Sequence, residues 1–440
     1  MNIAFISLGC DKNRVNTEQM MALCAQAGMK LQAEPEGADV VVINTCGFID
    51  SAKSEAIGQI LEMAALKAAG EVGKILVTGC LSQRYQQEML TELPEVDGIM
   101  GTANYGDIVE AVTAVATGET FCRFGDINGP VEELPRLVST PAHYAYLRIA
   151  EGCSNRCAYC VIPSLRGKYR SRPMEDVLAE AEALAAQGVK ECIVIAQDIT
   201  RYGIDLYREK KLPELLHALC RLDFRWIRLL YLYPDTVTDE LIDTIAGEEK
   251  ICKYIDMPIQ HCNDTVLRAM NRRETKAGLT ALYRKLRDRI PQLVLRTSII
   301  TGLPYEDETA FEELCDFLRE VKIPRLGAFP YSPEEGTPAA EMPRVDTAEA
   351  ERRAELIVDV QSDVMDAFNE SRLGDVTEVV CDGWDGQSMC YVGRSWAEAP
   401  EVDGRIYFTA DREVAEGEFV LIRITDTMDG ELVGELCEEE

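Results

Sequence analysis

Short apolar runs alternate with helix-length amphipathic segments over about the first 120 residues of the chain. Each run is followed by a turn and then by a helical pattern. The predicted strands are Ile3–Leu8, Asp39–Asn44 and Lys74–Thr78, and the predicted helices are Asn16–Ala27, Ser51–Ala69 and Ser82–Leu93. Repeated strand–loop–helix units predict a parallel sheet covered by helices.

A second alternating region follows a linker, residues 121–141, which is interrupted by glycine and proline. Its predicted strands are Tyr144–Ala150, Glu191–Ala196, Trp226–Leu232, Tyr254–Pro258, Val294–Ile300 and Leu326–Tyr331. Its predicted helices are Met174–Gln187, Pro213–Leu222, Asp235–Gly247, Asp264–Met270, Ala277–Arg289 and Ala310–Val321. Such alternation predicts a partial barrel with its functional site at the carboxyl ends of the strands.

The pattern changes again near residue 373. Residues Val345–Arg372 form a long polar helical pattern without a core of its own, so we expect a helix that leads out of the barrel. The short alternating segments beyond it predict a small β-barrel. The predicted class is therefore α/β, with a parallel-sheet domain (1–120), a central partial (β/α)6 barrel (140–372) and a C-terminal β-barrel (373–440).

Composition places the chain among globular proteins of a reducing compartment. Of its 440 residues, 47% are hydrophobic, which supports sizeable cores. No apolar run reaches the roughly 18–20 residues of a membrane span, and the first residues read as a strand rather than a signal peptide. We therefore expect a cytoplasmic protein whose 16 cysteines hold metal or stay buried instead of forming disulfides.

The chain is strongly acidic, with a formal net charge of −31. Proteins that bind nucleic acid usually carry a basic surface, so this charge argues against a nucleic-acid substrate and favours a basic protein partner. The segment from Gly374 to Glu440 alone holds 18 acidic and four basic residues.

The most informative motif joins Cys153, Cys157 and Cys160 in a C-x3-C-x2-C spacing. Three thiolates so close in sequence can converge on one soft metal centre. A structural zinc ion requires four ligands, whereas a 4Fe–4S cluster held by three cysteines leaves one iron open to a small molecule. A zinc knuckle or three unrelated buried cysteines remain the alternatives at this point.

A second trio of cysteines follows the three strands of the first domain. Cys10, Cys46 and Cys80 each come directly after a predicted strand, and Gly9, Gly47 and Gly79 lie beside them. The carboxyl ends of parallel strands meet at one edge of the sheet, so these thiols can converge although they are far apart in sequence. The alternative is three ordinary loop cysteines.

The central motif, with Tyr159 before its last cysteine, resembles the signature of radical S-adenosylmethionine (SAM) enzymes. The resemblance implies that the open iron chelates SAM and that one electron releases a 5′-deoxyadenosyl radical. It also implies that Tyr159 lies beside the adenine. Gln197 and Asp198 after the second strand, and Thr301 and Gly302 after the fifth, are candidate SAM contacts because they lie at the same edge.

Three other features follow the strands or the cysteine motif. His261 is a candidate proton carrier, although an ordinary satisfied histidine is the better interpretation. Tyr305 stands where the family usually has glycine, which argues against a left-handed turn there. Four basic residues after the motif could meet the SAM carboxylate or an acidic target, or form a solvated, salt-bridged loop: Arg166, Lys168, Arg170 and Arg172.

The strings Ser7–Asn13, Asn44–Ile49 and Thr78–Leu81 resemble the N-terminal domain of the radical SAM methylthiotransferases, and the tail resembles their TRAM domain. The family places a second 4Fe–4S cluster on three cysteines, which here are Cys10, Cys46 and Cys80. It more often has proline at the position of Asp11. The resemblance implies sulfur insertion followed by methyl transfer from a second SAM, with no side chain assigned as a catalytic acid or base.

Within this family, the acidic tail and the strings 325–338 and 393–404 favour the branch that modifies a ribosomal protein. The implied reaction adds a methylthio group to the β-carbon of an aspartate in the twelfth, basic protein of the small subunit. A transfer-RNA methylthiotransferase of the MiaB type is the alternative enzyme, and a non-catalytic iron–sulfur scaffold is an alternative of another class. The sulfur donor, the electron donor and the residue that grips the aspartate are not indicated by the sequence.

Overall fold

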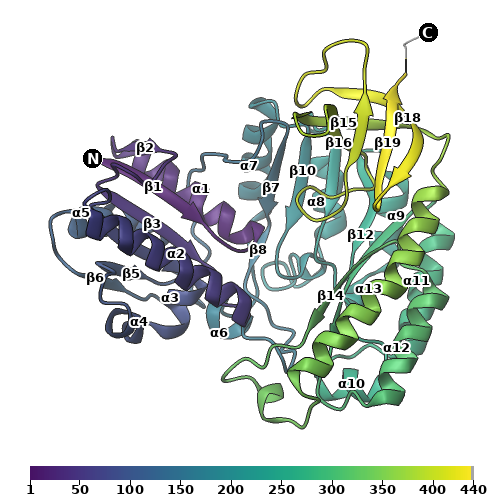
Figure 1. Ribbon diagram of the computed structural model, residues 1–440, viewed down its shortest axis with the longest axis horizontal. Coiled ribbons are helices and arrows are strands. Elements are labelled where there is room, and N and C mark those ends of the chain that lie inside the picture. The colour runs from purple at the N-terminus through teal and green to yellow at the C-terminus, as the bar shows by residue number, and fades with distance from the viewer. Residues whose placement is uncertain (438–440) are drawn as a thin grey trace.

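The computed structural model describes residues 1–437 and forms three bodies around separate sheets (Figure 1). The first is a six-stranded parallel sheet in the order β2-β1-β3-β4-β5-β6. Its strands are β1 (Asn2–Ser7), β2 (Lys30–Gln32), β3 (Val40–Thr45), β4 (Lys74–Gly79), β5 (Gly98–Met100) and β6 (Phe121–Arg123). The predicted parallel sheet is confirmed, and three short strands that sequence patterns did not indicate extend it.

Helices cover both faces of this sheet. On one face, α1 (Asp11–Gln26) and α5 (Ile108–Ala116) contribute Met20 and Val112 to the core. On the other face lie α2 (Asp50–Ala69), α3 (Cys80–Tyr85) and α4 (Gln87–Glu92). The single helix predicted over Ser82–Leu93 is wrong, because Gln86 adopts a φ of 45° and separates α3 from α4. A left-handed residue cannot continue a right-handed helix.

The second body is a six-stranded parallel sheet in the order β14-β13-β12-β11-β10-β7, which curves without closing. Its strands are β7 (Tyr144–Arg148), β10 (Glu191–Ile195), β11 (Trp226–Leu229), β12 (Ile251–Asp256), β13 (Val294–Thr301) and β14 (Arg325–Pro330). This confirms the predicted partial barrel. All strands run in one direction, so their carboxyl ends share one edge.

Helices on the outer face of this sheet bury the largest apolar core of the molecule. They are α7 (Met174–Ala186), α8 (Leu212–Leu219), α9 (Asp239–Gly247), α11 (Lys276–Arg289) and α12 (Glu308–Val321). Two short helices, α6 (Ile162–Arg166) and α10 (Asp264–Ala269), lie in the loops at the strand ends. A two-residue ladder of β8 (Ala150–Glu151) and β9 (Arg170–Ser171) closes the base of the cysteine loop.

The helix α13 (Thr347–Glu370) differs from its prediction as a connector without a core. It packs along β14 and α12, buries Ile357 in the main core, and pairs its buried Arg353 with Glu306 at 2.8 Å. The residues that this helix buries form a narrow stripe and are mostly small or polar. For this reason the sequence shows no clear apolar face. The helix is thus part of the barrel wall, visible in green in Figure 1.

The third body confirms the predicted small β-barrel. It closes in the order β15-β16-β17-β19-β18 around a core that includes Val379, Ile406 and Phe408. Its strands are β15 (Val376–Asp385), β16 (Cys390–Arg394), β17 (Ile406–Thr409), β18 (Phe419–Met428) and β19 (Glu431–Leu436). The predicted boundary at residue 440 lies outside the described residues.

The loop between β16 and β17 enters the interior of the partial barrel. Its Ala397 and Ala399 lie in one cluster with Tyr146 and Tyr254, which point inward from β7 and β12. Arg228 of β11, fully buried, donates to the carbonyl oxygen of Trp396 at 2.8 Å. The residues that this loop contacts lie within the strands and not at their carboxyl ends, so the loop fills the middle of the barrel, away from the edge that holds the predicted site.

In the part of the chain that the structure describes, no helix is long and apolar enough to cross a membrane.

Candidate functional site

The structure brings the three N-terminal cysteines together at the carboxyl edge of the first sheet. Cys10 precedes α1, Cys46 follows β3, and Cys80 is the first residue of α3 after β4. A Cβ atom on Gly9, whose φ is 85°, would lie 2.6 Å from the Cβ atom of Cys46. A Cβ atom on Gly47 would lie 2.8 Å from the Leu81 backbone. Glycine at both positions is therefore what allows the three loops to approach one another.

The pKa values of the thiols in this trio depend on burial, on the neighbouring thiols and on one cation. Burial, together with the neighbouring thiols of Cys80 and Cys10, raises the pKa of Cys46 to about 12. Burial also raises the pKa of Cys80, which the guanidinium of Arg166 partly offsets, with its Nε atom 3.3 Å from Sγ. Such thiols stay protonated unless a metal ion stabilises the thiolate.

The second trio lies in the loop between β8 and α6. The N–H of Cys153 donates to the carbonyl oxygen of Gly167 at 3.1 Å, and that of Cys160 donates to Cys157 at 3.1 Å. Burial raises the pKa of Cys153 to about 11 and that of Cys160 well above its usual value. Asn155, inside the loop, donates to the fully buried Asp198 at 2.9 Å, so the end of β10 holds the loop in place.

Arg166 connects the two trios. It belongs to α6, directly after the second trio, and is 97% buried against the first domain. Besides Cys80, its guanidinium donates to the side chains of Asn13 and Asn16 of α1, the latter at 2.9 Å, and to Glu151 at 3.3 Å. The alternatives for this residue were contact with the SAM carboxylate or an acidic target, or a solvated, salt-bridged loop; Arg166 is salt-bridged to Glu151, but it is buried between the domains and not solvated.

Glu151 is the carboxylate at the centre of this junction. Burial alone would raise its pKa, but Arg166 and Arg148 outweigh burial and lower the pKa to about 2. Gln197, a predicted SAM contact, donates its amide to the same carboxylate at 2.9 Å, and its Oε1 atom is buried without a hydrogen-bond partner. The ionised Glu151 thus holds the amide nitrogen of Gln197, and the amide oxygen of Gln197 is left as a free hydrogen-bond acceptor at the edge of the sheet.

Tyr159 lies between its two neighbouring cysteines and a cation. Its hydroxyl accepts a hydrogen bond from Arg272 at 3.3 Å, and burial together with the Cys157 thiol raises its pKa. Thr301 and Gly302 lie at the end of β13 as predicted. The Thr301 hydroxyl donates to Ala350 of α13 at 2.8 Å, and the Gly302 N–H donates to Glu306 at 3.0 Å.

The remaining sequence candidates have structural partners. His261 is fully buried; its Nδ1 accepts the N–H of Asn263 at 2.9 Å, and its Nε2 lies 3.3 Å from Glu306. Tyr305 adopts a φ of 65°, so the expectation of no left-handed turn is wrong: the turn persists with a half-exposed tyrosine in it. Of the other basic residues, Arg172 pairs with Glu133 and Glu180, Arg170 donates to backbone carbonyl oxygens, and Lys168 is exposed.

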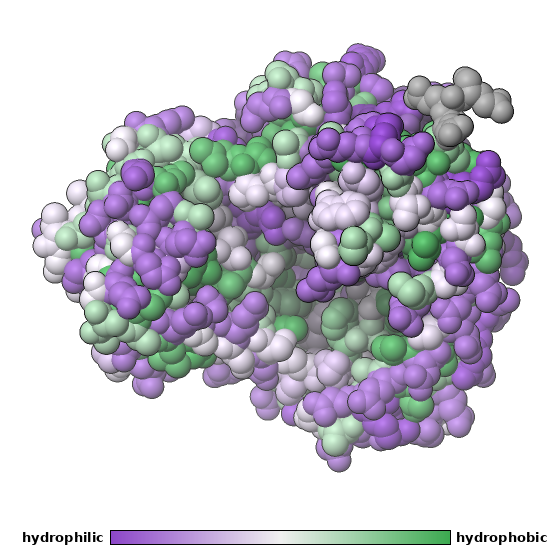
Figure 2. Space-filling model, turned by 45° about the horizontal axis from the view of Figure 1, so that its top comes forward, coloured by the Kyte–Doolittle hydropathy of each residue, from purple (hydrophilic) through white to green (hydrophobic). Residues whose placement is uncertain are grey.

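Sequence patterns missed two tyrosines that follow β11. The Tyr233 hydroxyl lies 3.6 Å from Cys157 Sγ, in the second trio. Tyr231, two residues earlier, contacts the first domain: its hydroxyl lies 3.4 Å from Asp11, and Lys12 lies over its ring. The segment that follows β11 therefore contacts both the second trio and the residues next to Cys10. Figure 2 shows that the surface is hollowed between the first domain and the other two. The only local signal was two aromatic residues after a strand end.

The two groups of cysteines fit some metal centres better than others. No three His, Cys, Asp or Glu side chains among residues 1–437 lie close enough to hold a single metal ion. In a cubane cluster each thiolate binds a different iron, so its ligands stand farther apart than those around one ion. A structural zinc ion would need a fourth ligand. Two groups of three sulfur donors fit cubane clusters better.

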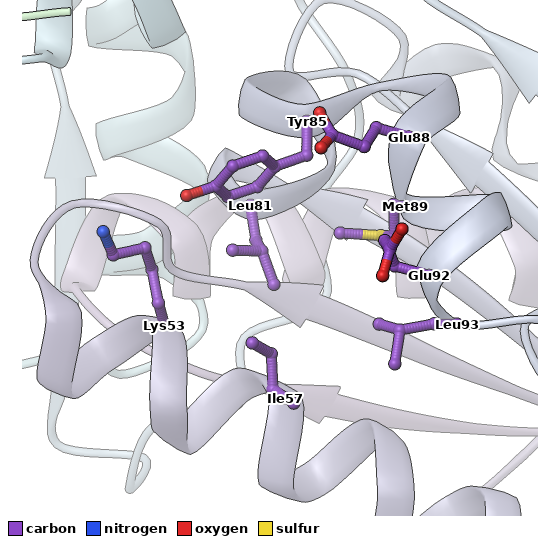
Figure 3. Close-up of a pocket in the computed structure, with 8 residues that line it drawn as sticks. All are labelled: Lys53, Ile57, Leu81, Tyr85, Glu88, Met89, Glu92 and Leu93. Atoms are coloured by element: carbon purple, nitrogen blue, oxygen red, sulfur yellow. The ribbon is translucent and has the colours of Figure 1, made fainter. Parts of the chain in front are cut away.

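A separate pocket of about 240 Å³ lies on the outer face of the first domain, between α2 and the pair α3–α4. Figure 3 shows Ile57, Leu81 and Leu93 pointing into it, with Glu88 and Glu92 near its edge. It contains none of the predicted site residues, although Leu81 directly follows Cys80.

Three family models match the chain. "Uncharacterized protein family UPF0004" matches residues 2–101, "Radical SAM superfamily" matches 147–318, and "TRAM domain" matches 373–437. Among solved structures, the radical SAM methyltransferase TsrM from Kitasatospora setae, with cobalamin and a [4Fe-4S] cluster bound, aligns with a TM-score of 0.58 and 13% identity over 77% of each chain. The cobalamin-dependent radical enzyme OxsB aligns with a TM-score of 0.51 and 12% identity, over 83% of this chain and 56% of that one. These two likenesses show a shared fold.

Similarity to curated proteins is much higher and covers whole chains. "Ribosomal protein uS12 methylthiotransferase RimO" of Thermoanaerobacter sp. (strain X514) is 44% identical over 437 residues, 99% of each chain. The protein of the same name from Clostridium tetani (strain Massachusetts / E88) is 45% identical over 439 residues, 99% of this chain and 98% of that one. The chain therefore belongs to the RimO family of radical SAM methylthiotransferases.

Proposed function

We propose that this enzyme adds a methylthio group to the β-carbon of an aspartate in ribosomal protein uS12. The observation that carries the proposal is the approach of two cysteine trios across one domain junction: Arg166 is bonded to Cys80 of one trio and ends the short helix that follows the other trio. Full-length similarity to proteins named for this reaction supports it. The β-carbon C–H bond is not acidic enough for a side-chain base, so its replacement by sulfur requires radical chemistry.

We assign Cys153, Cys157 and Cys160 to the cluster that binds and reduces SAM, and Cys10, Cys46 and Cys80 to a second 4Fe–4S cluster. When bound, these groups supply the radical and the sulfur, while the protein supplies position and shelter from water. The hydrogen bond between Asn155 and Asp198 holds the loop that carries Cys153, Cys157 and Cys160. Arg166 ties the end of that loop to the first domain.

Two side chains are proposed SAM contacts. Tyr159 lies beside the second trio, held by Arg272, where its ring can pack on the adenine. Gln197 keeps a free amide oxygen that can accept a hydrogen bond from the cofactor, because Glu151 already holds its amide nitrogen. No side chain is assigned as an acid or base.

The charge of the chain supports a basic protein substrate over an RNA. The C-terminal segment from Gly374 carries 18 acidic and four basic residues, a surface that repels phosphates and attracts lysine and arginine. We assign substrate attraction to this domain (373–440), SAM chemistry to 140–372 and sulfur delivery to 1–120. Because its substrate is a ribosomal protein, we place the activity in the cytoplasm.

The test is an activity assay of the anaerobically reconstituted enzyme on purified uS12, followed by mass spectrometry. We expect uS12 to gain the mass of one methylthio group, located on an aspartate. Methylthio addition to transfer RNA instead would favour the MiaB-type reaction. A protein that forms no 5′-deoxyadenosine from SAM and dithionite would be a scaffold rather than an enzyme.

A further inference from the structure

Lys12 is a buried cation at the junction of the two cysteine trios. It stands two residues after Cys10 and is 6% exposed. Its Nζ atom lies 3.0 Å from Asp11 Oδ1 and 3.0 Å from the centre of the Tyr231 ring, which belongs to the other domain. A lysine is rarely buried unless it is paired, and here its recorded carboxylate partner is the residue next to it in the chain.

The immediate surroundings of Lys12 leave a donor and an acceptor available. A lysine ammonium has three N–H donors; Asp11 takes one, and the aromatic face stabilises the charge from another side. The Asp11 side chain is only 6% exposed, and its second oxygen, Oδ2, is buried without a hydrogen-bond partner. Buried polar atoms are normally paired, so an unpaired one beside a cation indicates a place for a ligand.

The protein holds Tyr231 in a costly conformation to form this site. Its φ of 67° is in the left-handed region, which residues other than glycine rarely adopt. The carboxylate of Asp256 keeps it there by accepting its N–H at 3.1 Å. Backbone strain of this kind persists where the surrounding structure enforces it, commonly at functional sites.

Other cations around the junction already have carboxylate partners on other elements. Arg166 and Arg148 share Glu151, Arg296 pairs with Asp256, and Arg14 pairs with Glu401. Lys12 therefore differs from these residues, because its partner does not tie it to another element. The position is also near the second trio, since Tyr233 contacts Cys157 from the same strand end.

We propose that Lys12 binds the carboxylate of the target aspartate, while Asp11 Oδ2 accepts an N–H of the same substrate segment. This inference rests on the proposed function and names the residue that holds its substrate. An aspartate that leaves water needs a cation to offset its desolvation. The carboxylate on Lys12 would fix the adjacent β-carbon between the two trios, which is the carbon that must react.

The test compares two synthetic uS12 segments, one with the target aspartate and one with asparagine in its place, binding to the reconstituted enzyme by fluorescence anisotropy. A charge-assisted hydrogen bond of about 1.5–3 kcal/mol predicts that wild type prefers the aspartate segment by roughly 10- to 100-fold. Lys12→Met should bring this preference close to one. Lys12→Gln, which can still donate to Asp11, should do the same and serves if the methionine variant does not fold. The control Lys190→Met, at an exposed lysine paired with Asp223, should keep the preference.

The outcomes separate this inference from the proposed function. If wild type methylthiolates uS12 and prefers the aspartate segment, and Lys12→Gln keeps that preference, the role of Lys12 is refuted while the function stands. If wild type neither binds nor modifies uS12, the proposed function itself fails.

Discussion

Replacing Glu398 with glutamine should release the loop that fills the barrel interior. Glu398, 1% exposed, accepts hydrogen bonds from Arg372 at 2.5 Å, Arg325 at 2.9 Å, and the Ser395 N–H and hydroxyl at 3.0 and 2.6 Å. Glutamine keeps the shape but leaves both guanidinium groups without a counter-charge. Removing one partner of a buried ion pair is costly because the other charge stays buried.

The magnitude follows from the pKa of Glu398. Burial alone would raise this pKa, but Arg372 and Arg325 outweigh burial and lower it from 4.5 to about 2. That difference corresponds to about 3 kcal/mol of stability from the ionised form. Because the folded-state pKa is the lower one, this stabilisation is complete above pH 4.5 and disappears as the pH falls through about 2. At pH 7 the glutamine variant should lose all of it.

The assay is hydrogen exchange with mass spectrometry at pH 7 on peptides that cover residues 395–403. If the loop exchanges by opening locally, a loss of about 3 kcal/mol raises its exchange rate by roughly 100-fold in E398Q. The control is E355Q, at an exposed glutamate of α13, which should exchange as wild type does. Equal exchange of this loop in E398Q and wild type would refute the reasoning that these ion pairs hold it.

Three further predictions concern the cysteine trios. The reconstituted enzyme should hold about eight irons, and alanine at Cys153, Cys157 and Cys160 should leave about half; a variant that keeps all its iron would disprove the ligand assignment. Gly9→Ala should also leave about half the iron, lost from the first domain, because its Cβ atom would overlap Cys46 at 2.6 Å; unchanged iron with an unchanged spectrum would contradict this. Arg166→Met removes one of the two arginine partners of Glu151 and leaves the Oδ1 atoms of Asn13 and Asn16 without their donor, so we expect a melting temperature lower by about 1–2 °C for each kcal/mol lost; an unchanged melting temperature would show that this clamp does not stabilise the junction.

Much of the fold can be predicted from local patterns, because the alternating strands and helices of a parallel sheet give alternating apolar runs and amphipathic segments in the sequence. The convergence of Cys10, Cys46 and Cys80 followed from the rule that parallel strands end at one edge. What failed depended on contacts between distant segments. Nothing near Arg166 indicates that it is buried against α1, and α13 reads as polar although it forms part of the barrel wall.

The left-handed turns show the same limit. Tyr305 and Tyr231 are residue types that avoid positive φ, so a local rule excludes the conformations that they adopt. Each is held by its surroundings: the N–H of Tyr231 by Asp256, and that of Tyr305 by the carbonyl oxygen of Pro343 at 3.3 Å. Such positions can be recognised only when the segments that hold them are known.

Glu401, in the loop that fills the barrel, contacts all the parts of the molecule at once. It accepts hydrogen bonds from Arg14 of α1 at 2.9 Å and from the hydroxyls of Tyr144 and Tyr146 of β7 at 3.3 and 3.2 Å. Through Glu401 the C-terminal barrel thus contacts α1, the helix whose first residue follows Cys10. A change at Glu401 would therefore be felt both in the partial barrel and in the helix that begins directly after Cys10, which links the C-terminal body to the cysteine trio of the first domain.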